Sequence, residues 1–296
     1  MREESRRRRI LTWVLGVLVV WAVAAYLILP RLWYHREHQP GLAEADMVTH
    51  TERGIPGDPL NVGLVGSEDD VLAAMHAAGW YPADPVTLKS SVRIVASVML
   101  DRPYDAAPVS PLLYQGRKED LAFEKPIGDS ADRRNHVRYW KVLEKGVEGR
   151  PVWLGSATQD AGVELSRDTG QVTHHIAPDI DDERNLLIGD LVAAKVVTTL
   201  YGMTGVGPTL NGRNGGGDRY YTDGEIKMAV LSPGAAPVDK PPVQDPDPPI
   251  VALKNQVWSA VASAVAPCGD QPFGDQSLAR AKWPSMLAPL SMTRTR

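Results

Sequence analysis

The chain has 296 residues, a hydrophobic fraction of 43% and a formal net charge of -4, which suits one good-sized packed domain and excludes a disordered protein. Without the basic amino end, the net charge of the remaining chain is more negative still, so we do not expect nucleic acid as a partner. Cys268 is the single cysteine, which excludes an internal disulfide and a metal cage built from cysteines.

The first predicted element is a membrane-spanning helix at residues 10–29. This stretch, ILTWVLGVLVVWAVAAYLIL, carries no charge and at about 1.5 Å per residue reaches about 30 Å, the thickness of the hydrocarbon core of a bilayer. Trp13, Trp21 and Tyr26 supply rings that settle near membrane interfaces. The alternatives are a buried helix of a soluble protein and a signal peptide cleaved after the alanines of this stretch.

The charges beside this helix predict its orientation. In the basic leader, residues 1–9, Arg2 and the run Arg6 to Arg9 outweigh Arg31 and Arg36 on the other side. Because basic residues resist transfer across the membrane potential, we expect the amino end to stay in the cytoplasm. The protein is therefore expected in the plasma membrane, with its main domain outside the cytoplasm and the lipid bilayer as its first partner.

The segment at residues 30–54 is polar and rich in turn formers, which predicts a juxtamembrane stalk. Beyond it, the apolar run from Leu60 to Val65 predicts a strand. Ser67, with Asp70 three residues later, indicates a capped helix start, and Gly79 is a typical left-handed helix terminator. We therefore expect a helix at residues 68–78.

Between residues 112 and 176 the pattern changes to short β-like runs separated by turn residues. Polar and apolar side chains alternate around His136, so this strand presents two different faces. Asp179 is expected to begin a helix that continues to about Tyr201 and ends at Gly202. With two strands flanking Gly215 to Asp218, the pattern predicts an α+β fold in which a mostly antiparallel sheet packs against two main helices.

The last part of the chain divides into a proline-rich linker at residues 233–249 and a tail at residues 250–296. Proline lacks the backbone donor that regular structure needs, so the linker is expected to be irregular. Leu253, Val257 and Val261 recur at helical spacing and predict a short amphipathic helix over residues 250–265. Its apolar side could dock onto the domain, or it could bind a membrane or a partner, although no basic face accompanies it.

Several strings in the middle of the chain resemble the LssY carboxy-terminal domain family. They are PLNVGLVGS, the pair GW followed by AD, SPLLYQGRKEDLAFEK, RNHVRYW, PVWLGSATQD, THHIAPDIDDER and RNGGGDRYYTDG, in the expected order over residues 55–232. The resemblance implies no catalytic residues, because the family has no established activity. Its domains are often fused to membrane segments similar to lipid-phosphate phosphatases or DedA-type proteins, which implies work beside envelope lipids.

The densest polar string, THHIAPDIDDER at residues 173–184, allows two interpretations. In the first, Asp179 caps a helix, the next acids favour its positive end and Arg184 pairs with them at the surface. In the second, imidazoles and carboxylates gather around a divalent metal that activates water. The candidate ligands are His174, His175, Asp179, Asp181 and Asp160, and the candidate acid or base groups are His136, His174, His175 and Asp179.

Two further strings carry weaker signals. Arg117, Asp120 and Glu124 lie close in sequence beside Ser110, and we expect ion pairs there because no nucleophile elbow surrounds the serine. The glycines at residues 212–218 could approach an anion, but they do not lead into a helix. We expect a wide hairpin loop.

The sequence thus supports two hypotheses from different classes. The first is a binding or accessory module at the outer face of the membrane, serving envelope assembly, transport or lipid handling, with an envelope or membrane protein as a further possible partner. The second is a metal-assisted hydrolase acting on a phosphorylated or glycosylated envelope molecule.

Overall fold

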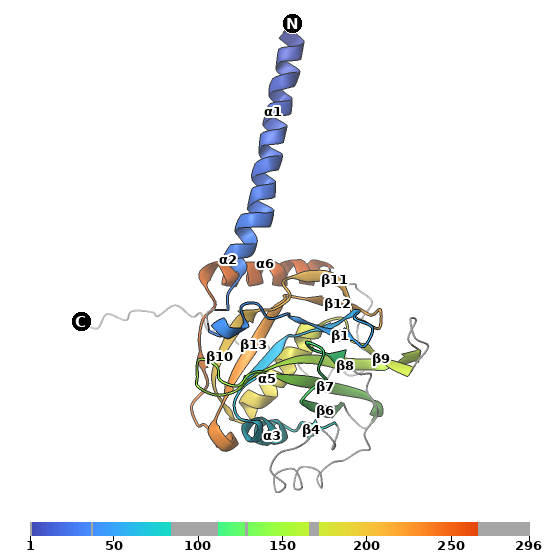
Figure 1. The fold of residues 1–296 in the computed structure, drawn as a ribbon, viewed down its shortest axis with the longest axis vertical. Coiled ribbons are helices and arrows are strands. Elements are labelled where there is room, and N and C mark those ends of the chain that lie inside the picture. The colour runs from blue at the N-terminus through green and yellow to red at the C-terminus, as the bar shows by residue number, and fades with distance from the viewer. Residues whose placement is uncertain (1, 37, 84–111, 128–129, 166–171, 266–296) are drawn as a thin grey trace, which may run out of the picture.

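The computed structural model describes residues 2–36, 38–83, 112–127, 130–165 and 172–265. A long helix projects from one end of an α+β domain (Figure 1). It runs through α1 (Arg2–Val23), a π-helical turn (Ala24–Ile28) and α2 (Leu29–Trp33). Within it, Ser5–Trp33 is long and apolar enough to cross a membrane, with a mean hydropathy of 2.3 and no burial of its most apolar stretch. The expected anchor is therefore present as an exposed apolar helix.

The main sheet has the strand order β14-β10-β13-β3-β8-β7-β6-β4, and β9 pairs with β8. Most neighbours are antiparallel, and the β10–β14 and β13–β3 pairs are parallel. The expected α+β class with a mostly antiparallel sheet is confirmed. The strands are β3 (Val62–Val65), β4 (Tyr81–Pro82), β6 (Leu121–Ile127), β7 (Ser130–Leu143), β8 (Val152–Leu165), β9 (Val172–Ile176), β10 (Val197–Thr204), β13 (Glu225–Leu231) and β14 (Val243–Gln244).

Smaller elements surround this sheet. A second sheet has the order β2-β1-β5, and β11 and β12 form a separate hairpin. These strands are β1 (Val48–Thr51), β2 (Pro56–Pro59), β5 (Leu112–Leu113), β11 (Thr209–Arg213) and β12 (Arg219–Thr222), and two 3-10 turns lie at Pro40–Leu42 and Pro233–Ala235. The helices of the domain are α3 (Glu68–Ala77), α5 (Ile180–Ala193) and α6 (Pro249–Val265).

The main sheet buries a different set of side chains on each face. Tyr139 of β7 packs in one apolar cluster with Leu72 of α3 and Leu187 of α5. Its neighbour Trp140 packs in a second cluster with Tyr114, beside β5. Alternation along β7 therefore divides the core into a helix-covered face and a face covered by the small sheet, as the two-faced pattern predicted.

Short-range signals in the sequence are confirmed. Ser67 and Asp70 form a reciprocal capping box at the start of α3, and Gly79 has a φ of +79° just beyond its end, a conformation that glycine adopts without steric cost. Asp179 caps α5 by accepting from the N–H groups of Asp181 and Asp182. The glycine-rich segment joins β11 to β12 as a hairpin.

The predicted extent of the helix after Asp179 was wrong. Instead of continuing to Tyr201, α5 ends at Ala193, and Lys195 turns the chain with a φ of +60°. The following Val197–Thr204 forms β10 beside β13. Its start is rich in β-branched residues, which favour a pleated strand, and Gly202 lies inside that strand rather than at a helix end.

Two segments expected to lie outside the domain contribute to it. In residues 30–54, Leu42 and Met47 are buried in the second apolar cluster, and the Arg36 guanidinium donates to the carbonyls of Leu42 and Ala43 at 2.7 and 2.8 Å. The linker at residues 233–249 adds β14, which pairs with β10. These elements could not be predicted from the polar, turn-rich sequence, because their partners lie far away along the chain.

Asn61 joins three elements and generates the first prediction. Its side-chain amide donates to the carbonyls of Ala157 and Ile180, both at 3.0 Å, and accepts from the Ala157 N–H at 2.9 Å. Asn61→Ala should lower the free energy of unfolding by about 3 kcal/mol, because buried backbone groups lose their partners. Urea unfolding of the detergent-solubilised protein measures this loss. The exposed Asn211→Ala is the matched control, and equal stability of both variants would contradict the assignment.

Candidate functional site

A buried polar cluster lies on the face of the main sheet that the small sheet covers. His136 and Arg138 come from β7, Asp160 from β8 and Asp58 from β2. The imidazole Nε2 of His136 lies 2.9 Å from Oδ1 of Asp160. Register explains this pair, because His136 is opposite Thr158, so that Asp160 projects from the same face two residues further on. His136 therefore has a carboxylate partner on the neighbouring strand.

Burial dominates the electrostatics of the two carboxyl groups in this cluster. Burial raises the pKa of Asp160 to about 7, although Arg138 and Arg134 oppose the shift and the charge of Asp58 adds to it. Burial likewise raises the pKa of Asp58, while Arg138 and a hydrogen bond from Asn214 lower it. Near neutral pH the cluster therefore holds a proton that an exposed carboxylate would release.

A second histidine–carboxylate pair adjoins the hairpin. Nδ1 of His175, on β9, lies 2.5 Å from Oδ1 of Asp218, whose other oxygen accepts from the Ile176 N–H at 3.2 Å. Asn214 orders this loop by accepting from the Asp218 N–H at 2.9 Å and donating to Asp58 at 3.1 Å. The partner of His175 thus comes from the glycine-rich loop, which the sequence identified as a separate feature.

Two other candidates in the histidine–aspartate string, Asp179 and Asp181, accept hydrogen bonds from neighbouring groups of the protein. Asp179 caps α5, and burial, followed by the charges of Asp182 and Asp181, raises its pKa to about 6. Asp181 accepts from the Thr222 hydroxyl at 2.6 Å and from the Asp223 N–H at 2.7 Å. The capping interpretation accounts for the contacts of Asp179, and the side chain of His174 lies outside the described residues.

The candidate metal ligands are distributed among several partners. His175 lies against Asp218, Asp160 against His136, and Asp179 against backbone N–H groups. Within the described part of the chain, no three His, Cys, Asp or Glu side chains gather closely enough to hold a metal ion. A metal at this string stays a prediction, because one of its proposed ligands is not described.

The ion pair expected at Arg117 is present, with Asp120 as its partner. Arg117 lies 3.4 Å from Asp120, as predicted, whereas Glu124 pairs with Arg134 of the next strand at 2.8 Å. Ser110 lies outside the described residues. This string therefore supplies pairing across β6 and β7.

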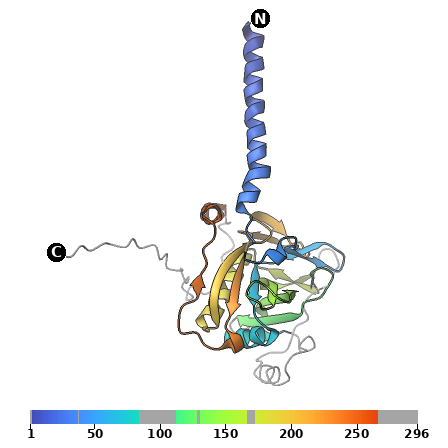
Figure 2. The same cartoon turned by 60° about the vertical axis from the view of Figure 1, so that its left-hand side comes forward.

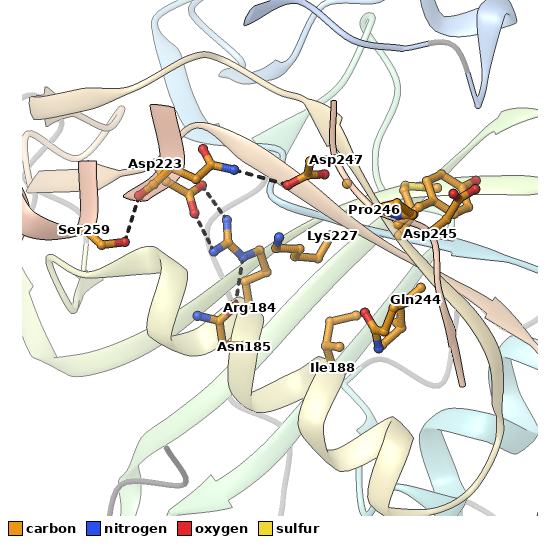
Figure 3. Close-up of a pocket in the computed structure, with 15 residues that line it drawn as sticks. Arg184, Asn185, Ile188, Asp223, Lys227, Gln244, Asp245, Pro246, Asp247 and Ser259 are labelled. Atoms are coloured by element: carbon orange, nitrogen blue, oxygen red, sulfur yellow. Dashed lines mark hydrogen bonds and ion pairs between the residues drawn. The ribbon is translucent and has the colours of Figure 1, made fainter. Parts of the chain in front are cut away.

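A pocket of about 500 Å³ lies between α5, β10, β13 and the segment that leads into α6 (Figure 3). Its size falls within the range of small-molecule sites. Its lining side chains are mainly polar or charged and include Arg184, Asp223, Lys227, Asp245, Asp247 and Asn255. Sequence reasoning missed this pocket because its lining residues come from several segments spread over residues 184–259.

Arg184 forms the fixed wall of the pocket. Its guanidinium donates two hydrogen bonds to Asp223, at 2.8 and 3.0 Å, and one to the Glu225 carbonyl at 2.9 Å. The side chain is only 2% exposed, so the expectation of a surface pair was wrong. Lys227 differs, because its ammonium has no hydrogen bond or ion pair with any described residue. Its charge nevertheless acts on two carboxylates of the pocket, because Lys227 helps to lower the pKa values of Asp223 and Asp247.

A charged clasp ties the pocket to the membrane helix. Glu225 is buried and pairs with Lys254 of α6, while His35, just beyond α2, lies 3.3 Å from its other carboxylate oxygen. Asp247, on the pocket wall, lies 3.7 Å from the same imidazole nitrogen. Burial alone would lower the pKa of His35, but Asp247 and Glu225 outweigh it and the pKa is raised. These four residues are called the Glu225 clasp below.

An exposed apolar helix joined to this α+β domain fits the class of membrane-anchored proteins. The family model described as LssY C-terminus matches residues 37–226. The chain belongs to that family, which confirms the resemblance seen in the sequence, and the match begins inside the segment expected to be a stalk. No curated protein and no solved structure matches the chain.

The raised pKa of Asp160 generates a second prediction. Its ordinary value is 3.8 and its folded value is about 7, so the folded state retains a proton that the unfolded chain releases in this interval. Asp160 makes its full contribution to the free energy of unfolding below about pH 4, and this contribution is lost as the pH rises through about 7. Asp160→Asn, which resembles the protonated form, should therefore flatten the fall in unfolding free energy between pH 4.5 and 7.5.

Denaturant unfolding of the full-length protein at several pH values measures this slope. Burial also raises the pKa values of Asp179 to about 6 and of Glu183 to about 8. The unfolding free energy of the variant should therefore still fall with pH, but less steeply. Asp239→Asn, at an almost fully exposed side chain, serves as the control. An unchanged slope in Asp160→Asn would show that this carboxyl is ionised in the folded protein.

Proposed function

We propose that the chain is a membrane-anchored binding module of the cell envelope whose pocket holds the polar headgroup of a membrane lipid. The observation that carries the proposal is the position of the pocket. Asn255 and Ser259 of α6 line it, and α6 contacts α2 at the foot of the membrane helix. A ligand that enters from the membrane surface would reach this pocket without leaving the interface.

The charges on the pocket wall favour a zwitterionic headgroup over a strongly anionic one. Lys227 is available to a phosphate, and charge-assisted hydrogen bonds of this kind are short and strong. Asp245 and Asp247 place negative charge on the same wall, which repels polyanions and attracts an ammonium group. Phosphatidylethanolamine combines these two groups in one headgroup.

The same geometry suits an accessory role in lipid handling or envelope assembly. Binding in such a pocket needs fixed walls, and the buried Arg184 and Glu225 provide them through their paired charges. The alternative, a metal-assisted hydrolase, receives no comparable support from the described residues. We therefore favour binding over catalysis.

The orientation that this function requires can be tested with Cys268, the single cysteine. The basic leader predicts that the amino end is cytoplasmic, so a membrane-impermeant maleimide should label Cys268 in intact spheroplasts. In the matched control, Ser5→Cys in a Cys268→Ser background, labelling should require permeabilised membranes. The reverse pattern would overturn the proposed topology, and with it the assignment to the envelope side.

Lys227 provides the test of the ligand. Short-chain phosphatidylethanolamine should raise the melting temperature of the detergent-solubilised full-length protein, because a ligand that binds only the folded state stabilises it. Lys227→Met should weaken binding at least about tenfold, since a hydrogen bond to a charged group contributes about 1.5–3 kcal/mol. Phosphatidylglycerol of the same chain length should bind more weakly to the wild type.

The control is Lys240→Met, which removes an exposed lysine from the linker and should leave lipid binding unchanged. If Lys227→Met and the wild type bound phosphatidylethanolamine with equal affinity, the pocket would not be the lipid-binding site. Absence of stabilisation by either lipid would contradict headgroup binding itself.

A further inference from the structure

Helix α6 lies across the foot of the membrane helix. The two views place it on the side of the domain from which α1 and α2 project, with its axis crossing theirs (Figures 1 and 2). It contacts α2, Leu29–Trp33. Since the uncharged run of the span ends at Leu29, α6 lies at the level where hydrocarbon gives way to lipid headgroups.

One face of α6 is docked on the domain. Val251 is fully buried, and Lys254 extends inward to pair with Glu225. Lys254 is the only charged residue in the sequence of this helix, PIVALKNQVWSAVASAV. The helix therefore satisfies its single charge inside the protein, and its outward face carries none.

The opposite face is apolar and exposed. Leu253 is 53% exposed and Val257 56% exposed, and Ala260 continues the same face one turn later. Residues at this spacing share one side of a helix, and Leu253 and Ala260 lie on the far side from Val251. Gln256 is exposed at the edge of this face, which is otherwise apolar and carries no charged residue.

We propose that α6 is an interfacial helix whose outward face, Leu253, Val257 and Ala260, inserts into the bilayer surface beside the anchor. Continuity with the membrane helix identifies lipid as the occupant, because a helix that touches α2 is already at the membrane boundary. The absence of basic residues on this face indicates that binding depends on apolar burial and not on anionic lipid. The sequence left open whether α6 docks onto the domain or binds a membrane. In this proposal it does both, with one face on the domain and the other on the membrane.

The test uses the full chain in lipid nanodiscs and a nitroxide label at Ala260→Cys in a Cys268→Ser background. Power-saturation measurements should show high accessibility to oxygen and low accessibility to a water-soluble nickel complex. A label at Lys240→Cys, on the exposed linker, should show the opposite pattern. Adding Leu253→Asp and Val257→Asp, both at exposed positions, should move the Ala260 label into water without loss of folded protein.

Three results would overturn the proposal. The Ala260 label could be as accessible to the nickel complex as the Lys240 label, which would place the face in water. It could be shielded from both reagents, which would indicate a protein partner in place of lipid. The accessibility of the Ala260 label could also stay the same when Leu253→Asp and Val257→Asp are added. None of these results depends on whether the pocket binds a headgroup.

Discussion

The buried carboxylate of Glu225 is the interaction on which the membrane-proximal half of the molecule depends. It comes from β13 in the middle of the main sheet, and it receives Lys254 from α6 and His35 from the end of the membrane helix. Burial raises the pKa of Glu225, and these cations oppose the shift. A buried charge is costly without such partners, so this contact fixes the anchor, the sheet and α6 relative to one another.

Similar pairs of buried charges occur elsewhere in the domain. They join elements whose relative positions an apolar core alone would not fix. Arg184 is held between Asp223 and Asp181, and Arg138 contributes positive charge between Asp58 and Asp160. Replacing buried ion pairs by apolar groups often leaves stability unchanged. Their role here is therefore positional: they set where the small sheet, the hairpin and the pocket wall lie against the main sheet.

Local chemistry made parts of the fold predictable. The span, the Ser67 capping box, the Gly79 terminator and the helix at residues 249–265 each depend on residues close together in sequence. The strand after Lys195 has a β-strand signal in its valine and threonines, but these residues also fit the helical spacing of the preceding segment. The Glu225 clasp and the pocket could not be predicted, because Lys227 and Glu225 acquire their roles from partners brought together by the fold.

The carboxyl-terminal segment contacts the domain through β14 and Lys254 although the family match ends at residue 226. Without residues 243–265, the pocket would lose Gln244, Asp247 and Asn255 from its wall, and Glu225 would lose the ammonium that neutralises it. The matched residues supply Arg184 and most strands of the main sheet, whereas most of β13, which pairs with β10 and β3, lies beyond residue 226. The segment beyond it contributes Asn255 and Ser259 to the pocket wall and exposes Leu253 and Val257, so that the proposed ligand site and the proposed membrane contact lie on the same helix.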